Sequence, residues 1–510
     1  MSAIIEGARE ASVEERSSPA STATVIGRSF SYRILAQLLS ALINVAGMVA
    51  LGNYLAADGY GEYAFYYALV PLIASLSDLG VGVIITREIA RQPELGPRYL
   101  GDAVMLKVAL GAVMALGITA IAPFAFDRGH AVLVWLVTIT ALFDLGQDVG
   151  IWVFRAHDRQ DFEALLLLVS QVVWLAGILL CAALHAPLAF TIASATLAFL
   201  LRTAVSAALV RRLLYRPRIE VDWRRIRGLI GEGLPFGLAV FAVVLYGRAG
   251  VLLLKGLARD ADVAYFNIGY MLSQPLGFIS SAFSVSAFPS LSRGARVGPE
   301  GVRPVLRSAV KFQFLAAMPI SVGLFLLSPR VVPLLLHHGD FERAGVALSV
   351  MSLGLTLIFL NLMSRYVLAA VDRQRAYLGA ILTGLAVNVT VSVLTIRSFG
   401  YLGACLGLLA GEGAVLLVCQ HALARFAPRW DLVREGIRPL MAALAMGGVV
   451  FALRRANLAL VVGAGATTYV ATAFALGTFS GDEMRVMRHV YASFRLPGWE
   501  WLTRRDREVS

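Results

Sequence analysis

Long apolar stretches separated by short polar segments recur along the whole chain. Each stretch is close to the roughly 20 residues that an α-helix needs to cross the hydrocarbon core of a bilayer. The pattern predicts an all-α membrane protein with about fourteen transmembrane helices, and twelve is the alternative count. The expected spans lie near residues 30–53, 62–86, 102–125, 131–154, 162–184, 187–210, 229–256, 263–290, 309–329, 345–370, 376–396, 402–424, 436–453 and 457–478.

Composition supports a chain whose main solvent is lipid. The 510 residues are 58% hydrophobic and only 15% charged, whereas about a quarter of a soluble protein is charged. The net charge of +12 comes mostly from arginine. In a membrane protein such an excess is typical of cytoplasmic loops, so no nucleic acid partner is expected. Three cysteines lie in apolar stretches, which indicates packing and no metal site.

The distribution of basic residues predicts the orientation of the chain. With the N-terminus inside, the inner segments carry 33 Lys and Arg residues and the outer loops carry seven. Basic residues stay on the cytoplasmic side of a membrane. We therefore expect both termini to be cytoplasmic.

Two sequence motifs occur twice, once in each half of the chain. Asp58 and Asp260 belong to matching outer loops that are 202 residues apart, and Arg91 and Arg293 keep that offset. The motif Asp-Arg-Gln at 158–160 recurs 214 residues later. Spans 1–6 therefore repeat as spans 7–12 in the same orientation. Two such bundles related by an axis along the membrane normal form a transporter architecture, with the substrate between them.

The repeat divides the chain into segments. The expected domains are a disordered cytoplasmic tail (1–27), a six-helix bundle (28–212), a basic cytoplasmic linker (213–228), a second six-helix bundle (229–425), two extra transmembrane helices (426–478) and a basic cytoplasmic tail (479–510).

Basic residues inside spans are candidates for substrate contact, because charge in a bilayer is costly. Arg248 lies beyond the middle of span 7, and Lys255 follows on the same helical face. An arginine at that depth needs a carboxylate or a ligand phosphate, and both partners stay open. Arg33 and Asn44 in span 1 complete the expected substrate-binding set. Lys107, Arg202 and Arg365 lie toward inner helix ends, where they are expected to snorkel.

Four carboxylates inside spans are candidates for ion coupling. Asp144 and Asp148 lie one turn apart in span 4, Asp78 lies in span 2 and Glu412 lies in span 12. Such groups take up a proton, coordinate Na⁺ or form structural pairs. Asp144 and Asp148 are favoured, because two carboxylates one turn apart repel when both are ionised.

The sequence carries no signature of catalysis. It has no Walker lysine loop for ATP, no catalytic triad spacing and no metal cluster. We therefore expect no enzyme activity, no catalytic residue and no cofactor. Energy would come from a proton or sodium gradient, or from consumption of the product.

Three stretches resemble the polysaccharide biosynthesis transporters, the O-antigen and exopolysaccharide repeat-unit flippases of the superfamily that includes multidrug exporters. They begin with NYLAADGYGEY at Asn53, GLPFGLAVFAVVLYGRAG at Gly233 and SRYVLAAVDRQ at Ser364. The resemblance covers about residues 28–425. Members often carry an acidic residue two positions after the span 7 arginine, where this chain has Gly250.

The resemblance implies a flippase in the bacterial inner membrane. Its substrate would be an undecaprenyl-pyrophosphate-linked oligosaccharide, moved from the cytoplasmic to the periplasmic leaflet by alternating access. Expected partners are this lipid-linked substrate, membrane lipids, and the glycosyltransferases and polymerase of the same pathway. The alternatives are a cation-coupled multidrug exporter of the same superfamily and a membrane-embedded polysaccharide polymerase.

Overall fold

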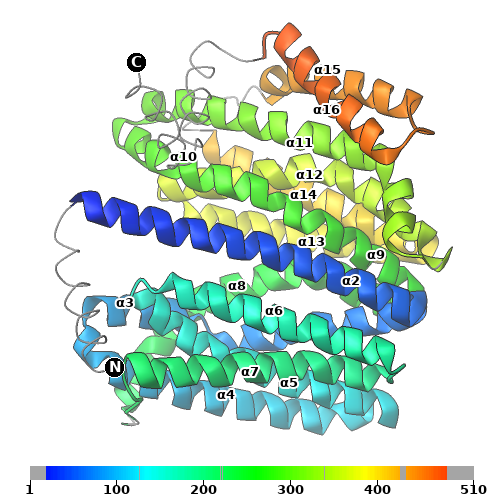
Figure 1. Ribbon diagram of the computed structural model, residues 1–510. Helices are drawn as coiled ribbons and strands as arrows, with labels where there is room; N and C mark the ends of the chain where they lie inside the picture. The colour runs from blue at the N-terminus through cyan, green and yellow to red at the C-terminus, as the bar shows by residue number, and fades with distance from the viewer. Residues whose placement is uncertain are drawn as a thin grey trace, which may run out of the picture.

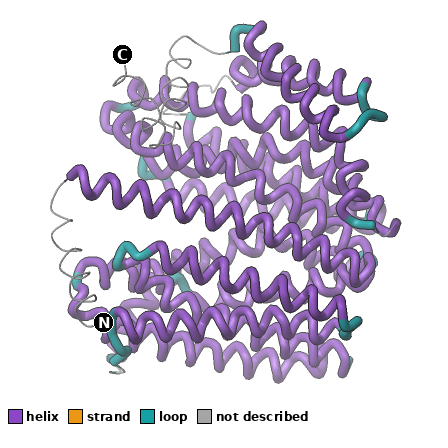
Figure 2. The backbone as a smooth tube through the Cα atoms, in the orientation of Figure 1, coloured by secondary structure: helices purple, strands orange, loops and turns teal. Residues whose placement is uncertain are grey.

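The computed structural model describes residues 19–125, 127–218, 220, 222–337, 339–424 and 432–478. Within these ranges the chain forms α-helices and short 3-10 turns, and no strand (Figures 1 and 2). The predicted fold class is confirmed. The tail predicted at 479–510 lies outside the described residues, as does 1–18, while the following nine residues of the predicted N-terminal tail begin the first helix.

The helices fall into three groups along the chain. The N-half contains α2 (Pro19–Asp78), α3 (Val81–Arg91), η2 (Pro93–Leu95), α4 (Gly96–Ala125), α5 (Arg128–Ala156), α6 (Gln160–Ala183) and α7 (Leu188–Leu213). The C-half contains α8 (Trp223–Leu257), α9 (Asp260–Ser273), η3 (Gln274–Leu276), α10 (Gly277–Val297), α11 (Pro299–Leu335), η4 (Gly339–Phe341), α12 (Glu342–Ala370), α13 (Gln374–Phe399) and α14 (Tyr401–Leu423). Two further helices are α15 (Leu432–Ala452) and α16 (Leu458–Ala475).

The described helices bear on the predicted count of about fourteen spans. Twelve of them are long and apolar enough to cross a membrane. One of the twelve, the part of α2 over Ala36–Asp78, has 43 residues, about 65 Å of helix and twice the thickness of a bilayer core. It turns at Ala56, whose φ is 52° and ψ is −174°, and so supplies two spans. α9, η3 and α10 follow one another over Asp260–Val297, where the eighth span is predicted.

The internal repeat is visible in the backbone. Asp158 and Asp372, which are 214 positions apart, both have a φ of 56°. Such a left-handed conformation is uncommon in residues other than glycine. The next backbone N–H, that of Arg159 or Arg373, donates to a carbonyl five residues back at 2.8 or 2.7 Å. The same turn therefore closes the fourth span of each half, as the repeat predicts.

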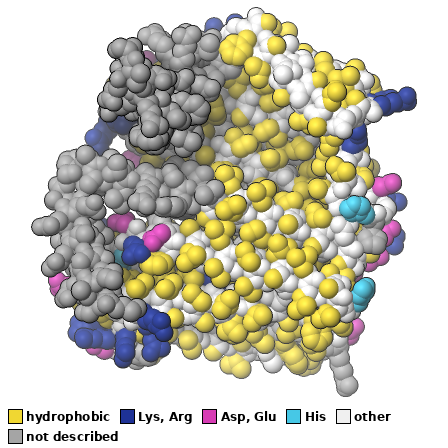
Figure 3. Space-filling view, in the orientation of Figure 1, with side chains coloured by type: hydrophobic (Ala, Val, Ile, Leu, Met, Phe, Trp, Pro, Cys, Tyr) yellow, Lys and Arg dark blue, Asp and Glu magenta, His cyan; other side chains and the backbone are white. Residues whose placement is uncertain are grey.

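Apolar side chains cover the middle of the molecule. In Figure 3 they form a broad band, and Lys and Arg side chains gather toward the ends of the helices. Leu116 of α4 and Leu394 of α13 are 71% and 72% exposed. Exposure of large apolar side chains on this scale would be unfavourable in water. The band is therefore the surface that faces the lipid.

The two halves touch at both ends of the helices. At the end predicted to be outer, the Asp58 carboxylate accepts from the backbone N–H of Ala261 at 3.1 Å. A Cβ on Gly61 would lie 1.8 Å from the Asp260 carbonyl oxygen, so α2 and α9 meet backbone to backbone. At the opposite end, Arg87 of α3 pairs with Glu232 of α8 at 2.8 Å.

Candidate functional site

A small cavity lies between the two halves. Its volume is about 40 Å³, which is room for only a few water molecules. The lining comes from both spans of α2 and from α6, α8 and α9: Asn44, Met48, Leu51, Tyr60, Tyr63, Ala64, Tyr67, Trp174, Arg248, Asn267 and Met271. Arg248 and Asn44, both predicted to bind substrate, line this same cavity.

Arg248 brings a positive charge to the cavity. Among the residues that the structure describes, no carboxylate lies within ion-pair distance of its guanidinium. The side chains of Tyr67 and Tyr270 are close enough to interact electrostatically with the Arg248 guanidinium. Of the two partners left open for Arg248, a carboxylate is therefore not found within the described part of the chain. A guanidinium in this setting is ready for an anionic ligand.

Gly250 departs from the pattern of the resembling family for a steric reason. A Cβ at this position would lie 2.3 Å from the ring of Phe266 on α9. Position 250 therefore faces the packed interface with α9, and an acidic side chain there would displace Phe266. In this chain the arginine of α8 has no acidic neighbour two positions later.

Aromatic rings form much of the cavity wall. Tyr63 stacks on Tyr67 with ring centroids 5.6 Å apart, and Tyr67 stacks on Trp174 at 6.3 Å. The Trp174 indole donates to the Tyr63 hydroxyl at 3.2 Å. Sequence reasoning missed these residues. A signal was present, because the spacing of Tyr60, Tyr63 and Tyr67 places three rings on one helical face.

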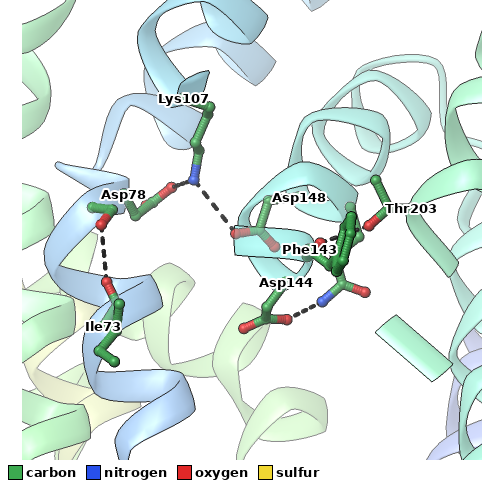
Figure 4. Close-up of polar contacts among 9 residues, drawn as sticks. Ile73, Asp78, Lys107, Phe143, Asp144, Asp148 and Thr203 are labelled. Atoms are coloured by element: carbon green, nitrogen blue, oxygen red, sulfur yellow. Dashed lines mark hydrogen bonds and ion pairs between the residues drawn. The ribbon is translucent and has the colours of Figure 1, made fainter. Parts of the chain in front are cut away.

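A cluster of charged residues lies inside the N-half (Figure 4). The Lys107 ammonium is 2.6 Å from the Asp78 carboxylate and 3.6 Å from that of Asp148. Gln147 donates to Asp144 one turn away. The Lys107 side chain is only 6% exposed, so the prediction that it snorkels to the headgroups is wrong. The structure brings three of the four ion-coupling candidates together around a lysine.

The charges in this cluster do not balance. Arg202 of α7 is the second cation that interacts with Asp144 and Asp148, and its Nε is buried without a hydrogen-bond partner. Three carboxylates therefore face two cations. Counted by formal charge, the cluster has one carboxylate more than it has cations, and such an imbalance away from water is unfavourable.

Glu412, the fourth candidate, lies apart from this cluster. Its carboxylate is enclosed in the C-half, where it accepts from the Tyr246 hydroxyl at 2.9 Å and from the Asn361 amide at 2.7 Å. The trio joins α8, α12 and α14. No metal-binding group of three or more His, Cys, Asp or Glu residues is found among the described residues.

The two remaining predicted contacts lie elsewhere. Lys255 pairs with Asp260 at 2.6 Å and lines a separate hollow of about 490 Å³. That hollow also receives Phe65 and His130 from the N-half. Arg33 belongs to α2, and its side chain lies outside the described part of the chain.

The fold and the cavity define a multi-pass membrane transporter built from two repeated halves. Two family models each match more than half of the chain. The model described as "Polysaccharide biosynthesis protein" matches residues 26–295, and that described as "Lipid II flippase MurJ" matches residues 163–479. The chain belongs to the polysaccharide biosynthesis protein family, and it also matches the lipid II flippase model over residues 163–479.

Curated relatives agree with this assignment, and solved structures share the fold. The chain is 18% identical to the "Probable low-salt glycan biosynthesis flippase Agl15" of Haloferax volcanii, over 84% of this chain and 90% of that one. It is 22% identical to a Shigella dysenteriae protein named for O-antigen transport, over 72% and 92%. The fold matches "Lipid II flippase MurJ, inward closed conformation" with a TM-score of 0.71, at 12% identity over 87% and 97%. A MATE family multidrug transporter matches with a TM-score of 0.59, at 17% identity over 78% and 96%.

Proposed function

We propose that the protein flips an undecaprenyl-diphosphate-linked oligosaccharide from the cytoplasmic to the periplasmic leaflet of the bacterial inner membrane. The observation that carries the proposal is Arg248, a guanidinium in the cavity between the halves with no ion-paired carboxylate in the described chain. The relatives named for glycan flipping and O-antigen transport support a lipid-linked sugar as the substrate class.

The charge on the diphosphate explains why Arg248 is needed. Transfer of a bare phosphate out of water is prohibitive unless it is paired and hydrogen-bonded. A guanidinium binds phosphate oxygens through two parallel hydrogen bonds. Asn44 lines the same cavity. Its amide nitrogen donates one N–H to the Ser40 carbonyl at 2.8 Å, and its second N–H would serve the phosphate. Tyr67 and Trp174 offer flat apolar surfaces against which the sugar would pack, while the lipid tail stays in the bilayer.

We infer alternating access, and the way the halves meet supports this part of the proposal. In this structure the contact between Asp58 and the Ala261 backbone closes the end predicted to be outer. The cavity of about 40 Å³ is too small for a sugar. Loading and release therefore need the halves to part, first on the cytoplasmic side and then at Asp58. The excess of basic residues in the inner segments supports cytoplasmic termini for this cycle.

Ion coupling is part of the proposal. The acid cluster of Asp78, Asp144 and Asp148 has one negative charge more than its cations, Lys107 and Arg202, can balance. Uptake of a proton or Na⁺ in one access state and its release in the other would give the cycle a direction. Glu412 is a second candidate in the C-half.

A drug exporter of the same superfamily is the rival function. Such a cation-coupled exporter would prefer an acidic, aromatic cavity. This cavity is aromatic, but Arg248 faces it with no ion-paired carboxylate in the described chain, which argues against the rival. A membrane-embedded polymerase is the other rival, and sugar–sugar bond formation by the purified protein would establish it.

The test is flipping of a lipid-linked oligosaccharide in proteoliposomes. Arg248→Ala should insert normally and lose transport. Arg248→Lys should keep only part of the activity, because a point charge replaces a bidentate fork. Arg397→Ala is the matched control, since Arg397 is exposed at the end of α13. Wild-type flipping by a well-expressed Arg248→Ala protein would remove Arg248 from the substrate site.

A further inference from the structure

Lys107 sits at the centre of a buried junction in the N-half. Its ammonium contacts Asp78 at 2.6 Å and Asp148 at 3.6 Å, and lies 4.7 Å from the centre of the Trp152 ring. The three partners come from α2 and α5, so Lys107 of α4 ties three helices together. A buried ammonium must keep an anionic partner. The Lys107 ammonium should therefore lie closer to whichever of Asp78 and Asp148 is more negatively charged.

Asp78 is the last residue of α2, and the backbone turns immediately after it. Leu79 and Gly80 have φ values of 49° and 69°. A left-handed leucine costs about 1–2 kcal/mol and persists only where its surroundings hold it. The Lys107–Asp78 pair fixes the residue on one side of this turn.

The turn is also where the N-half touches α8 of the C-half. A Cβ on Gly80 would lie 2.3 Å from the Gly233 carbonyl oxygen and 2.3 Å from the Gly237 nitrogen. A Cβ on Gly237 would lie 2.4 Å from the Leu79 carbonyl carbon. The two segments thus meet backbone to backbone, with no room for a side chain. We call the contact of Leu79 and Gly80 with Gly233 and Gly237 the glycine joint.

We propose that Lys107 is a positioning residue that transmits the state of the acid cluster to the glycine joint between the halves. When Asp148 is charged and free, it competes with Asp78 for the ammonium. When Asp148 is neutralised by a proton or a cation, Lys107 belongs to Asp78 alone and the turn at Leu79 is held more firmly. Asp144 and Arg202, the other charged groups of the cluster, set which of these states is favoured.

The role of this link in transport rests on the proposed function. The link between Lys107 and the glycine joint can be tested without substrate. Hydrogen exchange of the purified protein, followed by mass spectrometry, reports the opening of backbone amides. The informative segments are those around residues 79–82 and 233–237. Lys107→Met should raise exchange in both segments on the order of tenfold or more, because it leaves Asp78 without its ammonium.

A second variant gives the opposite sign. Asp148→Asn removes the competing charge, leaves the ammonium to Asp78, and should slow exchange in the same two segments. A purely structural role would loosen the junction in both variants. Lys107→Arg should preserve exchange close to wild type. Arg159→Met is the control, since Arg159 forms an exposed local pair with Asp161 at 3.0 Å.

Unchanged exchange in Lys107→Met, or faster exchange in Asp148→Asn, would overturn the proposal. If Lys107→Met does not fold, Asp78→Asn tests the same link, and should raise exchange around residues 233–237. These measurements contain no substrate, so they stand even if Arg248→Ala flips normally and the proposed function fails. Conversely, Arg248→Ala could lose flipping while hydrogen exchange at the glycine joint stays unchanged in Lys107→Met. That result would support the flippase function and reject only the role of Lys107.

Discussion

The hydrogen-bonded trio of Glu412, Asn361 and Tyr246 permits a test by stability. A single substitution should lower the stability of the protein, and a triple variant should regain it. Each carboxylate oxygen of Glu412 has one donor, the Tyr246 hydroxyl at 2.9 Å or the Asn361 amide at 2.7 Å. Leaving a buried acceptor without its donor costs about 1–3 kcal/mol, and more for a charged group. Replacement of both partners by apolar groups of similar shape is close to neutral.

The single variant Asn361→Leu should therefore lower the free energy of unfolding by about 1–3 kcal/mol. It also removes the second donation from this amide, to the Glu412 backbone carbonyl at 3.0 Å. Tyr246→Phe should lower the free energy by a similar amount. The triple variant Tyr246→Phe, Asn361→Leu and Glu412→Leu should return to within about 1 kcal/mol of wild type, because no polar side chain of the trio remains.

Thermal unfolding in detergent measures these changes. For a chain larger than 250 residues, 1 kcal/mol corresponds to a shift of about 2 °C or less in the midpoint, so replicate scanning fluorimetry is required. The reasoning is refuted if Asn361→Leu melts with the wild type, or if the triple variant is no more stable than that single one. If Glu412 also serves ion coupling, the triple variant should be stable yet unable to transport.

Three further predictions concern orientation, sterics and coupling. Reporter fusions at Asp58 and Asp260 should both report the periplasm, and opposite sides would refute the parallel orientation of the repeat. Gly250→Asp should lower the melting temperature more than Gly256→Asp, because a Cβ at 250 lies 2.3 Å from Phe266 whereas one at 256 meets nothing within 4 Å. Asp144→Asn with Asp148→Asn should flip substrate without responding to an imposed proton or Na⁺ gradient, and an unchanged response would exclude these carboxylates as the coupling site.

The fold could be predicted from sequence because each bilayer span is specified locally. Some 20 apolar residues and a bias of basic residues are sufficient, and the repeated turns at Asp158 and Asp372 share a φ of 56°. The apolar pattern did not predict the break at Leu79. It predicted one continuous span over residues 62–86, whereas α2 ends at Asp78 and α3 begins at Val81. The glycine joint explains that break, and it depends on Gly233 and Gly237, which lie more than 150 positions further along the chain.

The candidate site was harder to predict, because proximity between helices is not encoded in any one span. Arg248 and Asn44 could be selected by type, but only the packing of α2 against α8 brings them to one cavity. Lys107 was misread because a lysine near a helix end ordinarily snorkels. Its partners Asp78 and Asp148 lie 29 and 41 positions away on other helices, and only the bundle reveals that they surround it.

One helix, α8 (Trp223–Leu257), carries three of the contacts that the proposed transport cycle uses. Along α8, Gly237 contacts the backbone of the N-half, the Tyr246 hydroxyl donates to Glu412, and Arg248 lines the cavity. Pro235 lies inside α8 at the glycine joint. Proline removes a backbone hydrogen bond and loosens the helix there, whereas no proline interrupts α8 between this point and its end at Leu257. A displacement at the joint is therefore absorbed at Pro235 or carried by a stiff helix to Arg248, about 16 Å further along from Gly237. The charge that would hold the substrate is mechanically connected to the place where the two halves meet.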